Sequence, residues 1–201
     1  MSDRFAEIGA YYDKLVAQYG HDPRACDYGR HESQQAKFKV MAEVVPLAGK
    51  RLLDVGCGFA DFADYLKQHH PTAAYDGVDI SQAMVTTAQD RHKDCNIRHL
   101  NILEDDPGEY DVVTANGIFY LLGEDAPEVM RRLISRMFHA AREAVAFNSL
   151  SARAVDPQPD EFYADPLETV AFCYTLTPWV VLRHDYHDRD FTCYLYKSRT
   201  T

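Results

Sequence analysis

The stretch that decides the fold is Leu52-Leu53-Asp54-Val55-Gly56-Cys57-Gly58-Phe59-Ala60-Asp61. A short apolar run ends in two closely spaced glycines and leads into a helical pattern, which is typical of a buried strand, a tight turn and a helix. Glycines at such a turn let the backbone approach a ligand at the end of the strand. Asp79 ends the next predicted strand, where doubly wound folds place an acid that accepts hydrogen bonds from a ribose.

Outward from this stretch, strands and helices alternate along the chain. The predicted strands cover residues 51–56, 73–80, 95–101, 110–116 and 143–150, and the helices between them cover 60–70, 81–92 and 125–142. Alternation predicts a mostly parallel sheet with helices on both faces, wound by right-handed crossovers. Two further strands, 179–186 and 191–197, are separated by only His187-Asp188-Arg189-Asp190. Because four residues cannot form a crossover helix, we expect these two strands to be antiparallel.

The two ends of the chain complete the predicted α/β fold. Apolar side chains at helical spacing predict an amphipathic helix over 3–18, ended by Gly20, and Ser33 is expected to cap a second helix that runs to Val45. We predict one doubly wound domain with a seven-stranded, mostly parallel sheet and an antiparallel last strand. Its parts are an N-terminal helical lid (1–46), a central core (47–150), and a C-terminal helix and two strands (151–201).

The composition excludes several kinds of partner. The chain has 201 residues and a formal net charge of −10, and no basic run exceeds two residues. Binding to nucleic acid or an anionic membrane depends on clustered Lys and Arg, so neither partner is expected. Five cysteines without a Cys-x-x-Cys pair indicate no disulfide framework and no zinc site. With no apolar stretch of membrane-spanning length and no signal sequence, we expect a cytoplasmic protein without a metal.

Two cofactor classes bind at a glycine turn of this kind, and Asp61 separates them. A dinucleotide fingerprint has Gly or Ala at the sixth position, where this chain has Asp61. A carboxylate at a helix N-terminus opposes a pyrophosphate but tolerates a sulfonium cofactor, which has no phosphate. The Tyr-x-x-x-Lys pair of short dehydrogenases is also absent from the sequence. A nucleotide-dependent oxidoreductase is therefore disfavoured.

These motifs resemble those of the class I S-adenosylmethionine-dependent methyltransferases. The resemblance lies in the stretches 53–58, 78–84 and 110–113 and extends over about residues 35–197. It implies that the core (47–150) binds S-adenosyl-L-methionine and yields S-adenosyl-L-homocysteine. The implied contact residues are Asp54, Gly56, Cys57 and Gly58 in the glycine turn, Asp79, Ile80 and Met84 after the second strand, Asn101, Ile102 and Leu103 after the third, and Asn116 and Gly117 after the fourth.

The chain departs from the family's pattern at two of these places. Ala60 stands where the family usually has a third glycine, which is expected to alter the turn only slightly because Ala is small. Asn101 stands where the family often has Asp, and its side-chain oxygen can also accept a hydrogen bond from an adenine amino group.

The lid supplies further candidates. Tyr12 and Tyr19 present aromatic faces that suit a sulfonium through cation–π attraction. A basic residue near the lid is expected to pair with the methionine carboxylate, and the candidates are Arg24, Arg30 and Lys37.

Catalytic candidates follow from the strand ends, because ligands in open α/β sheets bind beyond the carboxyl ends of the strands. They are Asn148 after the fifth strand, His184 after the sixth, and Tyr28 in the lid. Asp185 follows His184 directly, but neighbouring residues on a strand point to opposite faces, so the two are not expected to form a dyad.

The sequence therefore predicts methyl transfer to a small-molecule acceptor by in-line attack on the sulfonium methyl, in a monomer or homodimer. With no secure base, N-methylation or O-methylation of an already ionised group is favoured. Two alternatives stay open. One is a catalytically silent, cofactor-binding partner subunit, and the other is a protein or peptide methyltransferase.

Overall fold

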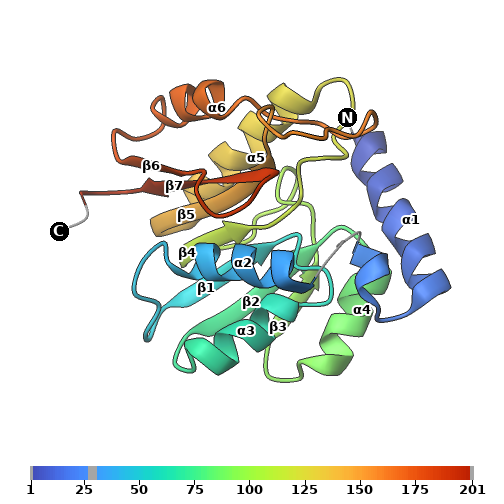
Figure 1. Cartoon of the computed structure of the whole chain (residues 1–201). Coiled ribbons are helices and arrows are strands. Elements are labelled where there is room, and N and C mark those ends of the chain that lie inside the picture. The colour runs from blue at the N-terminus through green and yellow to red at the C-terminus, as the bar shows by residue number, and fades with distance from the viewer. Residues whose placement is uncertain (1, 27–30, 200–201) are drawn as a thin grey trace.

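The computed structural model describes residues 2–26 and 31–199, which form a seven-stranded sheet covered by helices on both faces (Figure 1). The strand order is β3-β2-β1-β4-β5-β7-β6. The predicted α/β, doubly wound, mostly parallel sheet is thus confirmed. The strands are β1 (Arg51–Val55), β2 (Ala74–Asp79), β3 (Asn96–His99), β4 (Tyr110–Ala115), β5 (Ala141–Leu150), β6 (Val180–Arg183) and β7 (Asp190–Tyr196).

Strands β1 to β5 pair in parallel, with β1 and β4 at the centre. Leu52, Leu53, Val112 and Val113 on these two strands are fully buried, as expected for a parallel sheet covered on both faces. Because parallel strands end at the same edge, the loops that follow β1, β2, β3 and β4 gather there.

Strand β7 is antiparallel to both of its neighbours, β5 and β6. The predicted antiparallel last strand is confirmed, but β7 lies inside the sheet and β6 forms the edge. Asp190, the first residue of β7, pairs with Leu150, the last residue of β5. The reversed direction of β7 therefore brings its beginning to the edge where the parallel strands end.

Helices cover the two faces unequally. The face with α2 (His31–Ala42), α3 (Asp61–His69) and α4 (Gln82–Arg91) is opposite the face with α5 (Ala126–Ala140) and α6 (Pro166–Cys173) (Figure 1). Within the described part of the chain, no helix combines the length and apolar character needed to cross a membrane.

Tyrosine hydroxyls of β7 form hydrogen bonds with α2 and with the segment that follows it. Tyr194 donates to the carbonyl of Val40 at 2.6 Å, and Tyr196 donates to that of Val44 at 3.0 Å. The helix begins at His31, so the prediction that Ser33 caps it is wrong. Ser33 lies in the first turn, and its hydroxyl bonds the His187 ring instead.

Helix α1 (Ser2–Tyr19) lies along the carboxyl edge of the sheet, and the 3-10 turn η1 (Pro23–Cys26) follows it (Figure 1). Gly9 permits close approach of α1 to the backbone after β2, because a Cβ there would lie 2.7 Å from the carbonyl oxygen of Ile80. Asp13 accepts hydrogen bonds from the Ser81 hydroxyl at 2.6 Å and the Ala83 amide at 3.1 Å. Arg4 donates to the Leu121 carbonyl from the loop after β4.

Candidate active site

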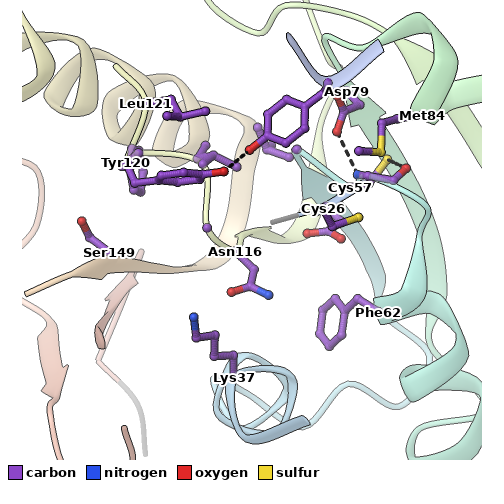
Figure 2. Close-up of a pocket in the computed structure, with 18 of the residues that line it drawn as sticks. Cys26, Lys37, Cys57, Phe62, Asp79, Met84, Asn116, Tyr120, Leu121 and Ser149 are labelled. Carbon is purple, nitrogen blue, oxygen red and sulfur yellow. Dashed lines mark hydrogen bonds between the residues drawn. The ribbon is translucent and has the colours of Figure 1, made fainter. Parts of the chain in front are cut away.

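A cavity of about 510 Å³ lies at the carboxyl edge of the sheet, beside α1 (Figure 2). Its size is in the range of about 300–1,000 Å³ that small-ligand sites occupy. We distinguish two parts of its wall. The motif half comprises Asp54, Gly56, Cys57, Gly58, Asp61, Asp79, Ile80, Met84, Asn101 and Ile102, and the turn half comprises Ser33, Lys37, Ser149, Glu161, His187, Asp188, Arg189 and Asp190.

The glycine turn of the motif half is set by backbone conformation. Gly56 has φ +72°, and a Cβ there would lie 2.3 Å from Cγ2 of Ile118. The amides of Gly56 and Cys57 both donate to the Val78 carbonyl, at 2.8 and 3.1 Å, which ties the turn to β2. Ala60 adopts φ 59° without being glycine, so the third position of the turn keeps the left-handed conformation despite its side chain.

Asp79 is fixed by backbone donors on both sides. One carboxylate oxygen accepts from the Gly58 amide and the other from the Ser81 amide, each at 2.8 Å (Figure 2). Each oxygen keeps further acceptor capacity on the cavity side. Burial raises the pKa of Asp79 above its usual value, against the opposing effect of these amides. The geometry suits a carboxylate that accepts hydrogen bonds from a diol.

Asp54 lines the same half but is held by side chains. Tyr75 donates to one carboxylate oxygen at 2.9 Å, and Thr114 donates to the other at 3.0 Å. Burial of the carboxyl group raises the pKa of Asp54 to about 7, although both hydroxyls favour the ionised form. A positively charged ligand in this half therefore finds a carboxyl group that can give up its proton.

The helix N-terminus beside the glycine turn already holds a carboxylate. Asp61 is the first residue of α3 and pairs with Arg91 at 2.7 Å. The positive end of the helix dipole is thus matched by protein charge, and a phosphate would meet repulsion here. Asp61, the buried Asp79 and the glycine turn together fit S-adenosylmethionine, whose ribose needs acceptors and whose sulfonium is a cation.

In the turn half, Asp190 lies against the side chains of His187 and Lys37, and His187 also contacts Ser33. Oδ2 of Asp190 lies 2.9 Å from His187 Nδ1 and 3.1 Å from Lys37 Nζ, and Ser33 Oγ lies 2.7 Å from His187 Nε2. Burial alone would raise the pKa of Asp190, but His187 and Lys37 outweigh it and lower that pKa. Lys37 extends from α2 into the cavity toward Asn116 (Figure 2). Asp190 is therefore an ionised, largely buried carboxylate that forms part of the cavity wall.

Asn148 joins the turn half to the loop after β4. Its Oδ1 accepts from the Gly117 amide at 2.7 Å, and its Nδ2 donates to Asn116 at 2.7 Å and to Asp190 at 3.3 Å. Asn148 is fully buried and does not line the cavity. The structure thus places this predicted catalytic residue behind the wall, where it positions others.

Arg189 forms a second charged group of the turn half. Its Nη2 donates at 2.5 Å to Glu161 and at 2.5 Å to the Tyr163 hydroxyl. The positive charge of the Arg189 guanidinium is therefore neutralised by the Glu161 carboxylate.

The chain is similar to known methyltransferases over most of its length. Residues 53–142 match a family described as a methyltransferase domain. A putative methyltransferase of Mycobacterium tuberculosis is 29% identical over 153 residues, which cover 72% of this chain and 92% of the relative. The solved structure of magnesium protoporphyrin IX methyltransferase from Synechocystis, with bound S-adenosylhomocysteine, has a TM-score of 0.69 at 14% identity and covers 96% of this chain and 99% of that one. In its sequence motifs and its fold, the chain is thus similar to the S-adenosylmethionine-dependent methyltransferases.

Some curated methyltransferases are longer than this one. A trans-aconitate 2-methyltransferase of Rhodopseudomonas palustris (strain BisB5) is 31% identical over 98 residues, which cover 48% of this chain but only 38% of the relative. The chain thus spans less than two thirds of the length of that relative.

Most residues predicted to bind the methyltransferase cofactor line the cavity. Asp54, the glycine turn, Asp79, Ile80, Met84, Asn101, Ile102, Asn116 and Gly117 all do so. Leu103 is not among the lining residues; its amide donates to Asn101 Oδ1 at 3.1 Å. That bond uses one lone pair of the amide oxygen that was expected to face the adenine.

The two tyrosines predicted to contact the cofactor, Tyr12 and Tyr19, differ in their position relative to the cavity. Tyr12 lines the cavity, and its hydroxyl lies 2.5 Å from that of Tyr120 (Figure 2). Tyr19 is outside the lining residues and packs near Phe59 and Met84, with the Arg24 guanidinium 4.8 Å above its ring. Tyr28, the third catalytic candidate, lies outside the described residues, as does Arg30. Arg24 pairs with Asp22 at 2.8 Å, whereas Lys37 reaches the cavity.

His184 is exposed just after β6 and is not among the residues that line the cavity. The histidine that does line it is His187, and its carboxylate partner is three residues further on, at Asp190. Sequence reasoning tested His184 against Asp185 and missed this pair, because Asp190 was treated only as part of the connection between the last two predicted strands. The signal that could have identified the pair was the three-residue separation of His187 and Asp190, which allows their side chains to meet across a turn.

Proposed function

We propose that this protein transfers the methyl group of S-adenosyl-L-methionine to a small-molecule acceptor by direct in-line attack, with S-adenosyl-L-homocysteine as the second product. One observation carries the proposal: the motif half and the turn half line the same cavity. When bound, the cofactor supplies an already activated methyl group. The protein's contribution is then to hold two molecules in line and to exclude water.

Each part of the wall has a role in this proposal. Asp79 accepts hydrogen bonds from the ribose, and the glycine turn with Asn116 and Gly117 faces the methionine portion. Ile80, Met84 and Ile102 supply apolar contacts for the adenine. Phe5, Ile8 and Tyr12 of α1 close the cavity from the side of solvent.

The volume of the cavity favours a compact acceptor over a peptide, which needs an open groove. The names of two similar proteins, methyltransferases of trans-aconitate and of magnesium protoporphyrin IX, support a small acceptor as well. A silent partner subunit has no need of the polar turn half, which makes that alternative weaker.

Calorimetric titration with S-adenosylmethionine and S-adenosylhomocysteine tests the proposal in wild type, Asp79→Asn and Asp76→Asn. Asp76 is a matched control on the same strand, since it does not line the cavity and bonds Tyr110 and Arg51 instead. We expect Asp79→Asn to weaken binding about 10- to 100-fold, because charged acceptors contribute about 1.5–3 kcal/mol per hydrogen bond. Asp76→Asn should bind like wild type. The proposal is wrong if the folded wild-type protein binds neither ligand.

A further inference from the structure

Exposed apolar side chains gather at one end of the sheet. In the described part of the chain, the exposed large apolar residues outside this end are Tyr11 and Val155. The others are Leu167 in α6, Tyr174 just after α6, Trp179 just before β6 and Val181 within β6. Single apolar side chains are normal on a protein surface, whereas a group of them marks an interaction surface. The end of the sheet formed by α6 and β6 is therefore a candidate interface.

Strand β6 also presents backbone groups without a partner at this end. It is the last strand of the sheet, and β7 is the only described strand that pairs with it (Figure 1). The Tyr196 amide donates to the Trp179 carbonyl at 3.0 Å, so the backbone groups of Trp179 and, two residues on, of Val181 face β7. The amides and carbonyls of Val180 and Leu182 then point out of the sheet. An edge of this kind is a template for one more strand.

The opposite edge of the sheet, at β3, is protected from strand addition. Its end residues Asn96 and His99 are polar and exposed. The Ile97 carbonyl accepts a hydrogen bond from the Gln89 side chain of α4 at 2.8 Å, so it is not open to another strand. Polar edge residues and covered backbone groups are the usual means by which proteins prevent edge pairing. Residues 180–182 of β6 are all apolar, and no side chain in the described ranges bonds their outward backbone groups.

A second copy of β6 fits this edge in one register. Two copies related by a two-fold axis pair in antiparallel fashion. The register that pairs all the outward groups places Val180 of one copy opposite Leu182 of the other. Val181 then lies at the axis, opposite Val181 of the second copy.

The side chains that face each other in this register are compatible. Two valines meet at the axis, and β-branched cross-strand pairs stabilise sheets. Arg183 lies opposite Trp179 of the second copy, where a guanidinium can stack on the indole. Arg183 also pairs with Glu43 at 3.0 Å and with Asp185 at 2.8 Å. It is the only charged residue in β6, so no like charges of the two strands stand opposite each other. A surface that complements itself in this way favours a second copy over an unrelated strand.

We propose that the protein forms a two-fold symmetric homodimer in which β6 of one molecule pairs antiparallel with β6 of the other, centred on Val181. The two sheets join into one continuous sheet. The two cavities open at opposite edges of that sheet, because the antiparallel pairing reverses the direction of the strands across the axis. Residues 179–183 do not line the cavity, so neither cavity depends on the other molecule. The inference is therefore independent of the proposed function.

Sedimentation velocity of the full chain tests the dimer. We expect the mass of two chains for wild type and the mass of one chain for Val181→Lys, because like charges directly opposite each other destabilise a strand pair. Val181 is 41% exposed within one molecule, so the variant should keep the wild-type circular dichroism spectrum. Val155→Lys is the matched control, since it makes the same change at a residue that is 93% exposed and lies outside α6 and β6. This control should stay dimeric.

Cysteine cross-linking tests the register. Residues opposite each other in a non-hydrogen-bonded antiparallel pair have Cα atoms about 4.5 Å apart, which a disulfide can span. Under oxidised glutathione, Val181→Cys should give a covalent dimer on a non-reducing gel. Val180→Cys should not, because residue 180 faces Leu182 of the second copy and its own counterpart is two residues further along. Wild type, which has five native cysteines, gives the background.

The remaining outcomes contradict the proposal. They are a wild-type monomer, a dimer that persists in Val181→Lys, dissociation of Val155→Lys to the same extent, and a cross-link in Val180→Cys in place of Val181→Cys. If Val181→Lys does not fold, the cross-linking result alone decides. Calorimetry with S-adenosylhomocysteine reports on the proposed function separately, so the failure of either proposal is recognised on its own.

Discussion

The motif half and the turn half of the cavity are built in different ways. In the motif half, backbone amides position the carboxylate that ends β2, as when the Gly58 and Ser81 amides hold Asp79. In the turn half, side chains that are distant in sequence meet, as when Ser33 bonds His187 across 154 positions. Backbone conformation limits which residue types a position accepts, and this limit is visible in the sequence. Side chains that meet through tertiary packing leave no such local pattern.

The largest expected effect breaks the motif half at Gly56. Gly56→Ala must adopt φ +72° and place a Cβ 2.3 Å from Ile118. Strain of about 1–2 kcal/mol from the left-handed conformation adds to about 1–3 kcal/mol from overpacking. We expect a loss of about 2–5 kcal/mol in unfolding free energy by urea titration, together with loss of cofactor binding.

Gly49→Ala is the matched control for this variant. Gly49 has the same φ, +72°, and a Cβ there meets nothing within 4 Å. Only the backbone strain of about 1–2 kcal/mol should remain, with cofactor affinity unchanged. Equal losses in the two variants would show that the contact with Ile118 does not matter.

A smaller effect is expected where α1 meets the motif half. Alanine in place of glycine normally stabilises a helix interior by about 0.5–1 kcal/mol. In Gly9→Ala the new Cβ would lie 2.7 Å from the Ile80 carbonyl oxygen, so α1 must move outward. We expect roughly tenfold weaker cofactor binding by calorimetry and faster proteolysis within residues 2–19. A variant that binds normally and resists protease better than wild type would contradict close docking of α1.

The smallest effect concerns a proton. With a pKa of about 7, Asp54 is half protonated at neutral pH, and a cationic ligand lowers that pKa because it favours the carboxylate. Binding of S-adenosylmethionine at pH 7 should therefore release up to roughly half a proton per site. Titrations at one pH in buffers of different ionisation enthalpy measure this release, and it should vanish in Asp54→Asn. Proton uptake in the wild-type protein would have the wrong sign for this account.

The comparison of the two halves also explains what the sequence could predict. The strand pattern and the stretch around Gly56 and Asp79 are local, so the fold and the sheet direction followed from spacing, and the resemblance to methyltransferases implied most of the motif half. Lys37 was a candidate for a different partner, and the pairing of His187 with Asp190 was not considered. The contacts among these three residues depend on the packing of α2 over β7 and on the turn before β7. Hydrophobic periodicity does not specify the backbone path of that turn.

The reversed course of β7 has a consequence for how acceptor choice can change. Because β7 begins at the cavity, the four residues 187–190 and one turn of α2 supply most of the polar turn half, while the glycine turn lies on other elements. Under the proposed function, the polar residues that face the acceptor therefore come mostly from two short segments, 33–37 and 187–190, while the glycine turn that would face the donor is a third segment. The two segments and the glycine turn can be substituted separately, although Asn148 connects Asp190 to the loop after β4.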